Sequence, residues 1–283
     1  MNNYRLPDEA HIGGVHLRVQ NLNRALAFYR DILGFNVEQV DHSTVALSAG
    51  GAPILWLTAH ADAVPKPRRS TGLYHVAILM PNRAALGKVL YRLLTSSWQL
   101  EGASDHLVSE ALYLSDADGN GLEIYADRPR EVWNFVNAQV AMATEPLDLD
   151  DLLQNADKSP WTGMPAGTII GHVHLHVSDL AQAEAFYSGG LGLDVMQRSY
   201  PGALFMAAGG YHHHLGANIW AGRTPPPPNA VGIEWFSLAV PGDAAWTALV
   251  EHVESAGVAI NERGDDYVLI RDGDGNGVRL ARE

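Results

Sequence analysis

The chain has 283 residues, of which 47% are hydrophobic and 18% are charged, and its formal net charge is −13. Its length predicts two globular domains, and its acidic charge argues against nucleic acid or an anionic membrane as a partner. It contains no cysteine, so disulfides and thiolate chemistry are excluded, and a tightly bound metal would need histidines and carboxylates as ligands.

Nothing in the sequence predicts export or membrane insertion. The N-terminal residues lack the basic and apolar regions of a signal peptide, and no apolar run approaches the roughly 18 residues of a membrane span. We therefore expect a cytoplasmic protein.

The first half of the chain predicts one order of elements twice. Residues 12–19 alternate as a strand does, Asn21 suits a helix N-cap, and helical spacing continues to Gly34. Short strands are predicted around residues 44–48 and 53–58. The pattern restarts at Leu73 with a strand, then a helix over about 83–94 and strands around 111–115 and 121–126. Each half is therefore predicted to hold two strand–helix–strand–strand–strand modules.

A long connection joins the two halves. Residues 128–167 read as a linker, with a short helix predicted over 148–155. A run of prolines, Pro225–Pro228, is interpreted as a stiff connector between the third and fourth modules.

The second half repeats the first. Residues 12–35 align with 170–193, including the Phe28–Tyr29 pair on Phe186–Tyr187. Residues 71–81 align with 231–241, and residues 112–126 align with 268–282. The chain is therefore a tandem duplication of four modules in all.

The paired I-x-H-V-x-L-x-V-x-D-L…FY…LG segments and the repeated module resemble the vicinal oxygen chelate superfamily, which includes glyoxalases, bleomycin-resistance proteins and extradiol dioxygenases. The tandem arrangement is similar to that of bacterial catechol 2,3-dioxygenases. The resemblance implies an α+β fold of four βαβββ modules that form two barrels, with domains over residues 8–127 and 168–283. A monomer would suffice if both barrels close within one chain.

The resemblance also implies where a metal would bind. In the extradiol branch, two His and one Glu occupy the first strands of modules and a last strand, and leave positions open for substrate and O2. The first-strand positions here are Gly14, His75, His172 and Trp235, in module order, and the last-strand positions are Glu123 and Arg279. The ligand-competent residues are therefore His75, Glu123 and His172, although a single strand His or Glu is more often a structural or surface residue.

Two further segments resemble extradiol motifs. Residues 106–123 contain His106, Tyr113 and Asp116 before Glu123, although Ala117 stands where the family usually has Pro, and Ser104 where a Gly-like residue is usual.

Residues 211–215, Tyr-His-His-His-Leu, resemble the segment that supplies the acid–base histidine, which corresponds to His213. The alternative is a solvated histidine tract without a role in chemistry.

An acidic segment begins directly after the strand predicted at 111–115, and its residues Asp116, Asp118, Asn120, Gly121 and Asp127 have the spacing of a calcium loop. Because an EF-hand needs helices on both sides, we interpret this segment as a hairpin turn.

The positions of the ligand-competent residues predict how the modules pair. Pairing module one with two and three with four would separate His172 from His75 and Glu123. Pairing two with three, and one with four, collects all three in one barrel, and the long linker can span the distance. A barrel of modules one and four would then be chemically silent, although His16 and Arg18 could leave it a polar pocket.

The resemblance implies an extradiol ring-cleaving dioxygenase that uses Fe(II), or alternatively Mn(II), to open catechol-type aromatic diols with O2. His213 would serve as acid–base, and Tyr113 and His106 would donate hydrogen bonds. Three alternatives stay open: a hydroquinone dioxygenase, a glyoxalase or isomerase with His213 or Asn218 as a fourth ligand, and a non-enzymatic small-molecule binding protein.

Overall fold

The computed structural model describes residues 4–283 and contains the four predicted modules in order. Module one comprises β1 (His11–Val19), α1 (Leu22–Tyr29), β2 (Asn36–Gln39), β3 (Thr44–Ser48) and β4 (Leu55–Ala59). Module two comprises β5 (Gly72–Leu79), α2 (Arg83–Thr95), β6 (Gly102–Asp105), β7 (Ser109–Ser115) and β8 (Gly121–Asp127). The fold is of the predicted α+β class.

The second half repeats this order. Module three comprises β12 (Ile169–His176), α4 (Leu180–Glu184), the π-helical segment η2 (Ala185–Gly190), β13 (Asp194–Gln197), β14 (Ala203–Ala207) and β15 (Leu215–Asn218). Module four comprises β16 (Gly232–Val240), α5 (Asp243–Ser255), β17 (Ile260–Arg263), β18 (Tyr267–Arg271) and β19 (Gly277–Arg282). In the first half the segment after α1 forms turns, which include the i→i−5 hydrogen bond from the Leu33 N–H to the Phe28 carbonyl, where the second half has the π-helical segment.

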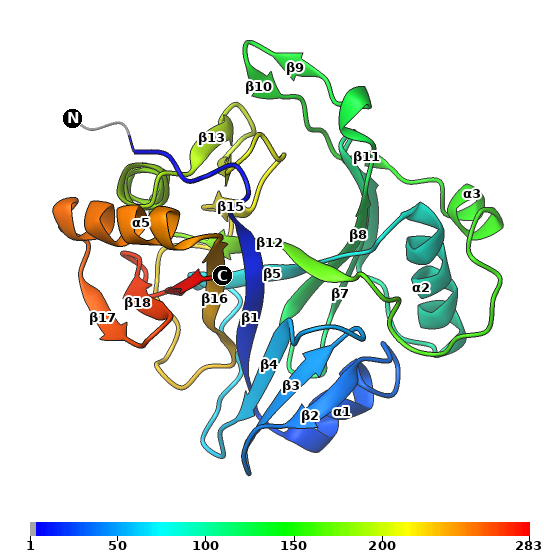
Figure 1. Ribbon diagram of the computed structural model, residues 1–283. Helices are drawn as coiled ribbons and strands as arrows, with labels where there is room; N and C mark the ends of the chain where they lie inside the picture. The colour runs from blue at the N-terminus through cyan, green and yellow to red at the C-terminus, as the bar shows by residue number, and fades with distance from the viewer. Residues whose placement is uncertain (1–3) are drawn as a thin grey trace.

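Two large sheets each combine strands from both halves of the chain (Figure 1). An 8-stranded sheet has the order β17-β18-β19-β16-β1-β4-β3-β2, and a 9-stranded sheet has the order β11-β6-β7-β8-β5-β12-β15-β14-β13. The first therefore unites modules one and four, and the second unites modules two and three. The first strands β1 and β16 pair antiparallel in one sheet, as β5 and β12 do in the other.

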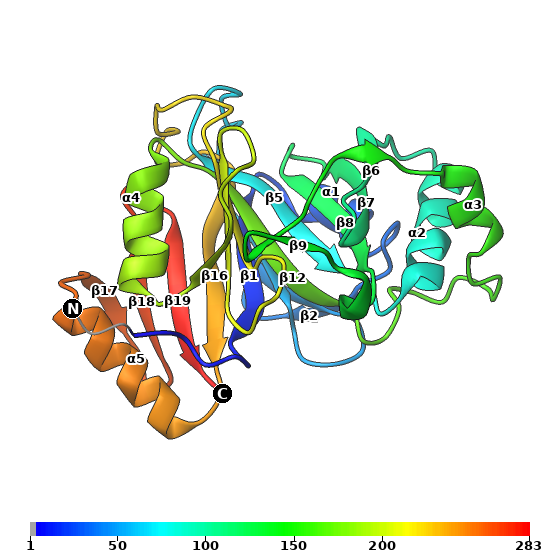
Figure 2. The same cartoon turned by 90° about the horizontal axis from the view of Figure 1, so that it is seen from above.

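The linker contains more structure than its composition predicts. It holds a 3-10 turn, η1 (Arg130–Val132), a small hairpin of β9 (Phe135–Val136) and β10 (Gln139–Val140), and the predicted short helix, α3 (Leu149–Gln154). Its strand β11 (Glu145–Pro146) pairs with β6 at the edge of the 9-stranded sheet. Figure 2 shows α3 beside α2, outside the strands. The linker is therefore part of the second sheet and its helical covering.

Side-chain capping fixes where the helices begin. The carboxamide of Asn21 accepts a hydrogen bond from the Arg24 backbone N–H at 3.0 Å, and Asp179 caps α4 in the same way. Helix α1 ends at Tyr29, earlier than the apolar spacing to Gly34 predicts, because tight turns complete the segment. Gly34 adopts a positive φ of 74° there, which suits a glycine at the end of a helix.

The repeated Phe–Tyr pair and the repeated acidic turn join one module to another. The buried Tyr29 hydroxyl donates to the Asp116 carboxylate at 3.0 Å, and Tyr187 donates to Asp272 at 2.8 Å. Asp116 also accepts from the backbone N–H groups of Asp118 and Asn120. These bonds make the segment a hairpin turn between β7 and β8, as predicted.

Apolar side chains from all four modules form the main core. They include Leu17, Ile78, Val173 and Leu238, each at most 1% exposed. Within residues 4–283, no helix is long and apolar enough to cross a membrane.

Candidate metal centre and its cavity

Three strands of the 9-stranded sheet bring His75, Glu123 and His172 together. His75 lies on β5, which pairs with both β8 and β12, the strands that carry Glu123 and His172. One ligand atom from each of the three side chains lies within 4.8 Å of the others. The three residues that the sequence singled out are therefore adjacent, and their separations stay well below the roughly 10 Å that would exclude a shared metal.

The separations within this cluster suit one small cation. The Nε2 atoms of His75 and His172 lie 3.0 Å and 3.4 Å from the Glu123 Oε2. Two ligands at right angles around an ion with bonds of about 2.1 Å lie about 3.0 Å apart. All three side chains are buried, and neither Nε2 atom has a hydrogen-bond partner. Because buried polar atoms are rarely left unbonded, these donor atoms fit a metal ion.

The protonation states also suit metal binding. Burial lowers the pKa of His172 to about 4, so its ring is neutral at pH 7. Burial acts to raise the pKa of Glu123, but the adjacent His172 and His75 rings outweigh it and hold that pKa well below its ordinary value. Two imidazole nitrogens and one carboxylate are a donor set that Fe(II), Mn(II) and Zn(II) share.

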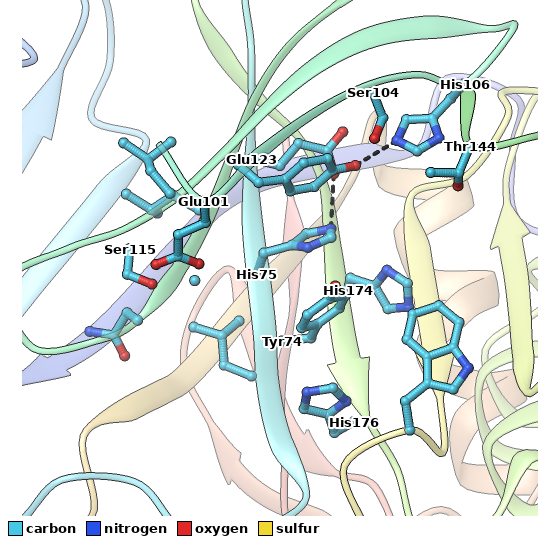
Figure 3. Close-up of a pocket in the computed structure, with 18 of the residues that line it drawn as sticks. Tyr74, His75, Glu101, Ser104, His106, Ser115, Glu123, Thr144, His174 and His176 are labelled. Atoms are coloured by element: carbon cyan, nitrogen blue, oxygen red, sulfur yellow. Dashed lines mark hydrogen bonds and ion pairs between the residues drawn. The ribbon is translucent and has the colours of Figure 1, made fainter. Parts of the chain in front are cut away.

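The cluster opens into a cavity of about 640 Å³ (Figure 3). His75 and Glu123 form part of its wall, and predicted acid–base and hydrogen-bonding residues, His213, Tyr113 and His106, also line it. A volume of this size accommodates a substituted single aromatic ring. The structure therefore brings every predicted site residue to one place.

Tyr113 and His106 act as a pair. The Tyr113 hydroxyl lies 2.6 Å from His106 Nε2, and His106 Nδ1 donates to the Ala143 carbonyl at 2.6 Å. In a neutral His106 ring, Nε2 then accepts the Tyr113 proton. Burial and the nearby Glu123 carboxylate raise the pKa of Tyr113 well above 10, so this hydroxyl stays protonated.

Further histidines and aromatic residues complete the cavity. His174 and His176, which share the face of His172 on β12, line it, as expected from strand alternation. Asn218 donates to His174 Nε2 at 3.0 Å and accepts from His176 Nδ1 at 2.6 Å, so its amide is engaged and does not offer a fourth metal ligand.

Sequence reasoning missed four aromatic wall residues. They are Tyr74, Tyr200, Phe205 and Trp220. Tyr200 and Trp220 lie outside the strands, where no periodicity reports which way a side chain points. Tyr74 on β5 and Phe205 on β14 are the two that had a strand pattern from which a face could have been predicted.

The sheet of modules one and four lacks the equivalent centre. Trp235 and Arg279 stand at the positions of His75 and Glu123, and the Arg279 guanidinium lies 5.4 Å from the centre of the Trp235 ring. A side chain at Gly14, the equivalent of His172, would collide with Trp56. Bulky side chains therefore fill the space that the other sheet leaves for a site.

Two other polar side chains of this sheet are already engaged with the protein. His16 hydrogen-bonds to Thr58 at 2.7 Å, and Arg18 forms an ion pair with Glu234 at 2.6 Å. Arg18 and Glu234 nevertheless line a polar cavity of about 320 Å³ together with Lys66 and Asp274, whereas His16 does not line it.

The duplicated modules and the cluster of two His and one Glu define a recognisable class of protein. Residues 10–124 and 169–280 match the Glyoxalase/Bleomycin resistance protein/Dioxygenase superfamily, and the chain belongs to this superfamily. Over 267 residues it is 44% identical to the catechol-2,3-dioxygenase of Bacillus subtilis (strain 168), a match that covers 92% of this chain and 93% of that protein.

Solved structures share the fold at low sequence identity. A proposed dioxygenase from Bacillus subtilis subsp. subtilis str. 168 superimposes with a TM-score of 0.68 at 14% identity, over 99% of this chain and 86% of that one. Glyoxalase I from Zea mays gives a TM-score of 0.58 at 17% identity, over 97% of this chain and 92% of that one. Because the fold is common to both chemistries, it does not distinguish between them.

Proposed function

We propose that this protein is an extradiol ring-cleaving dioxygenase that opens catechol-type diols with O2, with Fe(II) held by His75, His172 and Glu123. The observation that carries the proposal is the buried cluster of these three side chains, of which His75 and Glu123 line a cavity that also presents His213 and Tyr113. The 44% identity to a catechol-2,3-dioxygenase over 92% of the chain supports the same reaction.

Two neutral ligands and one carboxylate would leave positive charge on a bound divalent ion. Fe(II) there would supply Lewis acidity toward adjacent substrate oxygens and the redox chemistry that O2 requires. Mn(II) suits the same ligands. Three protein ligands on one side of an ion also leave room for two reactants, which favours a dioxygenase over an isomerase that needs a fourth protein ligand.

The protein groups around the cavity would manage protons. His213 would accept a proton from a catechol hydroxyl and later return it to the product. Tyr113, held by His106, would place its oxygen against the substrate. While His106 is neutral, Tyr113 donates to it and presents lone pairs to a substrate hydroxyl. If His106 gains a proton, the bond reverses and the Tyr113 O–H becomes free to donate.

The test is anaerobic reconstitution with Fe(II) or Mn(II), followed by O2-uptake assays with catechol, hydroquinone and methylglyoxal–glutathione. We expect one O2 consumed per catechol, and a yellow ring-opened product whose mass equals catechol plus O2. His172→Ala and Glu123→Ala should abolish both metal retention and turnover. Trp235→Phe, at the position equivalent to His75 in the other sheet, should change neither.

Each contrary outcome favours another class. Bound metal without O2 uptake, together with turnover of the methylglyoxal–glutathione adduct, would indicate an isomerase. O2 uptake with hydroquinone but not catechol would indicate the para-diol class. Failure to retain metal in the unmodified protein would indicate a binding protein.

A further inference from the structure

A continuous hydrogen-bonded chain leads from the end of β8 to the cavity. The Asp127 carboxylate lies 3.0 Å from His212 Nε2, and His212 Nδ1 lies 2.7 Å from His213 Nδ1. The His212 side chain is fully buried, whereas His213 is 8% exposed and forms part of the cavity wall. His212 therefore has no access to substrate, and it contacts both a carboxylate and the proposed acid–base residue.

The chemistry of these groups fixes the direction of each bond. An ionised carboxylate only accepts, so His212 Nε2 must donate to Asp127. In a neutral His212 ring, Nδ1 then carries the lone pair and must accept. The proton between the two rings consequently belongs to His213 Nδ1. His213 Nε2, which has no hydrogen-bond partner among residues 4–283, is left with a lone pair.

Neighbouring groups reinforce this direction at Asp127. The Tyr211 hydroxyl donates to Asp127 at 2.9 Å, so the Tyr125 hydroxyl, 2.7 Å away, donates in turn to Tyr211. The Trp133 ring contacts the His212 ring at a tilt of 58°, with ring centres 5.3 Å apart. Tyr125 donates to Tyr211, and both Tyr211 and His212 donate to Asp127. Asp127 is therefore the final acceptor of the network.

Strand geometry links this network to the metal cluster. Asp127 and Glu123 lie four residues apart on β8, and alternation places both side chains on the same face of the strand. One strand thus supplies a proposed metal ligand and the anchor of the hydrogen-bonded chain. The centres of the His213 and His172 rings lie 4.0 Å apart. The hydrogen-bonded chain and the metal cluster are therefore adjacent.

We propose that Asp127 and His212 are positioning residues that hold His213 in the tautomer whose Nε2 is free to take a proton from the substrate. The inference rests on the proposed function. In this step a catechol O–H bond breaks, an N–H bond forms at His213 Nε2, and the electron pair stays on the catechol oxygen. The imidazolium that forms at His213 keeps its hydrogen bond to His212, and the nearby Asp127 carboxylate orients His212 and stabilises that positive charge, as in other carboxylate-oriented histidines.

The tautomer can be measured without turnover. Nitrogen-15 NMR of histidine side chains, in protein loaded with diamagnetic Zn(II), distinguishes a protonated from an unprotonated ring nitrogen. The His213 signals are assigned by their loss in His213→Gln. We expect His213 to be protonated at Nδ1 in the unmodified protein. In Asp127→Asn the new amide N–H can donate to His212, which would reverse the chain and move the His213 proton to Nε2.

The kinetic arm uses a double-mutant cycle. Asp127→Asn should lower kcat by about 100-fold or more, the range for loss of a general base, with little change in KM and full metal content. In a His213→Ala background the same substitution should cost less than about 3-fold, because nothing remains to be positioned. Asp127→Glu should recover part of the activity.

The duplication provides a matched control. Glu283 occupies the position equivalent to Asp127 in the other sheet, where it pairs with His11 at 3.6 Å. Glu283→Gln removes the same charge and should leave kcat unchanged.

The outcomes are distinguishable from those that test the proposed function. Protonation of His213 at Nε2 in the unmodified protein would overturn the inference, even if ring cleavage occurs. An equal loss from Asp127→Asn with and without His213 would also overturn it, because the role would then be structural. If the protein cleaves no diol, the proposed function fails, while the NMR result still decides the tautomer.

Discussion

At the scale of single residues, the 9-stranded sheet and the loop before β15 hold several buried histidines whose pKa is lowered by burial. Burial lowers the pKa of His214 to about 3 and that of His172 to about 4. A buried neutral imidazole is a good metal ligand or proton acceptor, but it makes the folded state resist protonation. Folding stability should therefore depend on pH more strongly than the acidic composition alone indicates.

His214 offers a test of this dependence away from the proposed ligands. Its unfolded pKa is near 6.5 and its folded pKa is about 3, so below pH 6.5 the unfolded chain binds a proton that the folded chain does not. The contribution is complete above pH 6.5 and is lost as the pH falls toward 3. Urea unfolding of metal-free protein at pH 7.5, 6 and 5 should show a falling free energy of unfolding.

His214→Asn separates this contribution from that of the other histidines. The Asn Oδ1 can replace His214 Nδ1 as acceptor for the Ala208 backbone N–H, but it does not titrate. The variant should lose stability more slowly between pH 6.5 and 5, by roughly 1 kcal/mol for each pH unit. If the free energy of unfolding fell equally with pH in the variant and the unmodified protein, His214 would not be the source of the pH dependence.

At the scale of elements, the site depends on close contact between neighbouring strands. Gly121 begins β8, where a Cβ atom would overlap the Tyr74 carbonyl oxygen on β5. Its repeat counterpart, Gly277, begins β19, where a Cβ would overlap the Glu234 carbonyl oxygen on β16. Both glycines therefore allow a last strand to lie against a first strand.

These two glycines form a matched pair of variants. Gly121→Ala and Gly277→Ala should each lower the free energy of unfolding by about 1–3 kcal/mol, because the strands must shift apart. Only Gly121→Ala should also weaken metal binding, by about 10-fold or more, since it moves Glu123 away from His75. Urea unfolding measures the loss of stability, and isothermal titration calorimetry measures the metal affinity of each variant. Equal metal affinities of the Gly121→Ala and Gly277→Ala variants would show that the spacing between β5 and β8 does not determine metal binding.

At the scale of the whole molecule, the sequence halves and the sheets do not coincide. The pairs β1–β16 and β5–β12 each join one half of the chain to the other, and the linker adds β11 to the second sheet. Each half alone would expose the edges of two long central strands, a condition that promotes aggregation.

Splitting the chain tests this arrangement. Residues 1–127 and 168–283, expressed separately, should each lack a cooperative melting transition and a 1:1 metal site. Expressed together, they should co-purify and recover metal binding, because the two sheets then reform. Size-exclusion chromatography and circular dichroism measure the assembly and the melting. A monomeric, cooperatively melting half would show that folding does not need the pairing between halves.

The sequence alone determined the features that depend on local pattern or on the duplication. Strand alternation placed β1, the N-cap residue Asn21 marked a helix start, and the repeat revealed four modules. Because the repeat aligns equivalent positions, it also showed which slots carry His75, Glu123 and His172, and which carry Gly14, Trp235 and Arg279.

Only the tertiary structure decided what depends on contacts between distant segments. The short strands β2, β6 and β11 have weak patterns of their own and form because neighbouring strands offer hydrogen-bond partners. The same holds for the chain from Asp127 through His212 to His213, which joins β8 to a loop far along the sequence. A sequence pattern reports which face a side chain occupies, whereas hydrogen-bond partners across a sheet are fixed only when the strands pair.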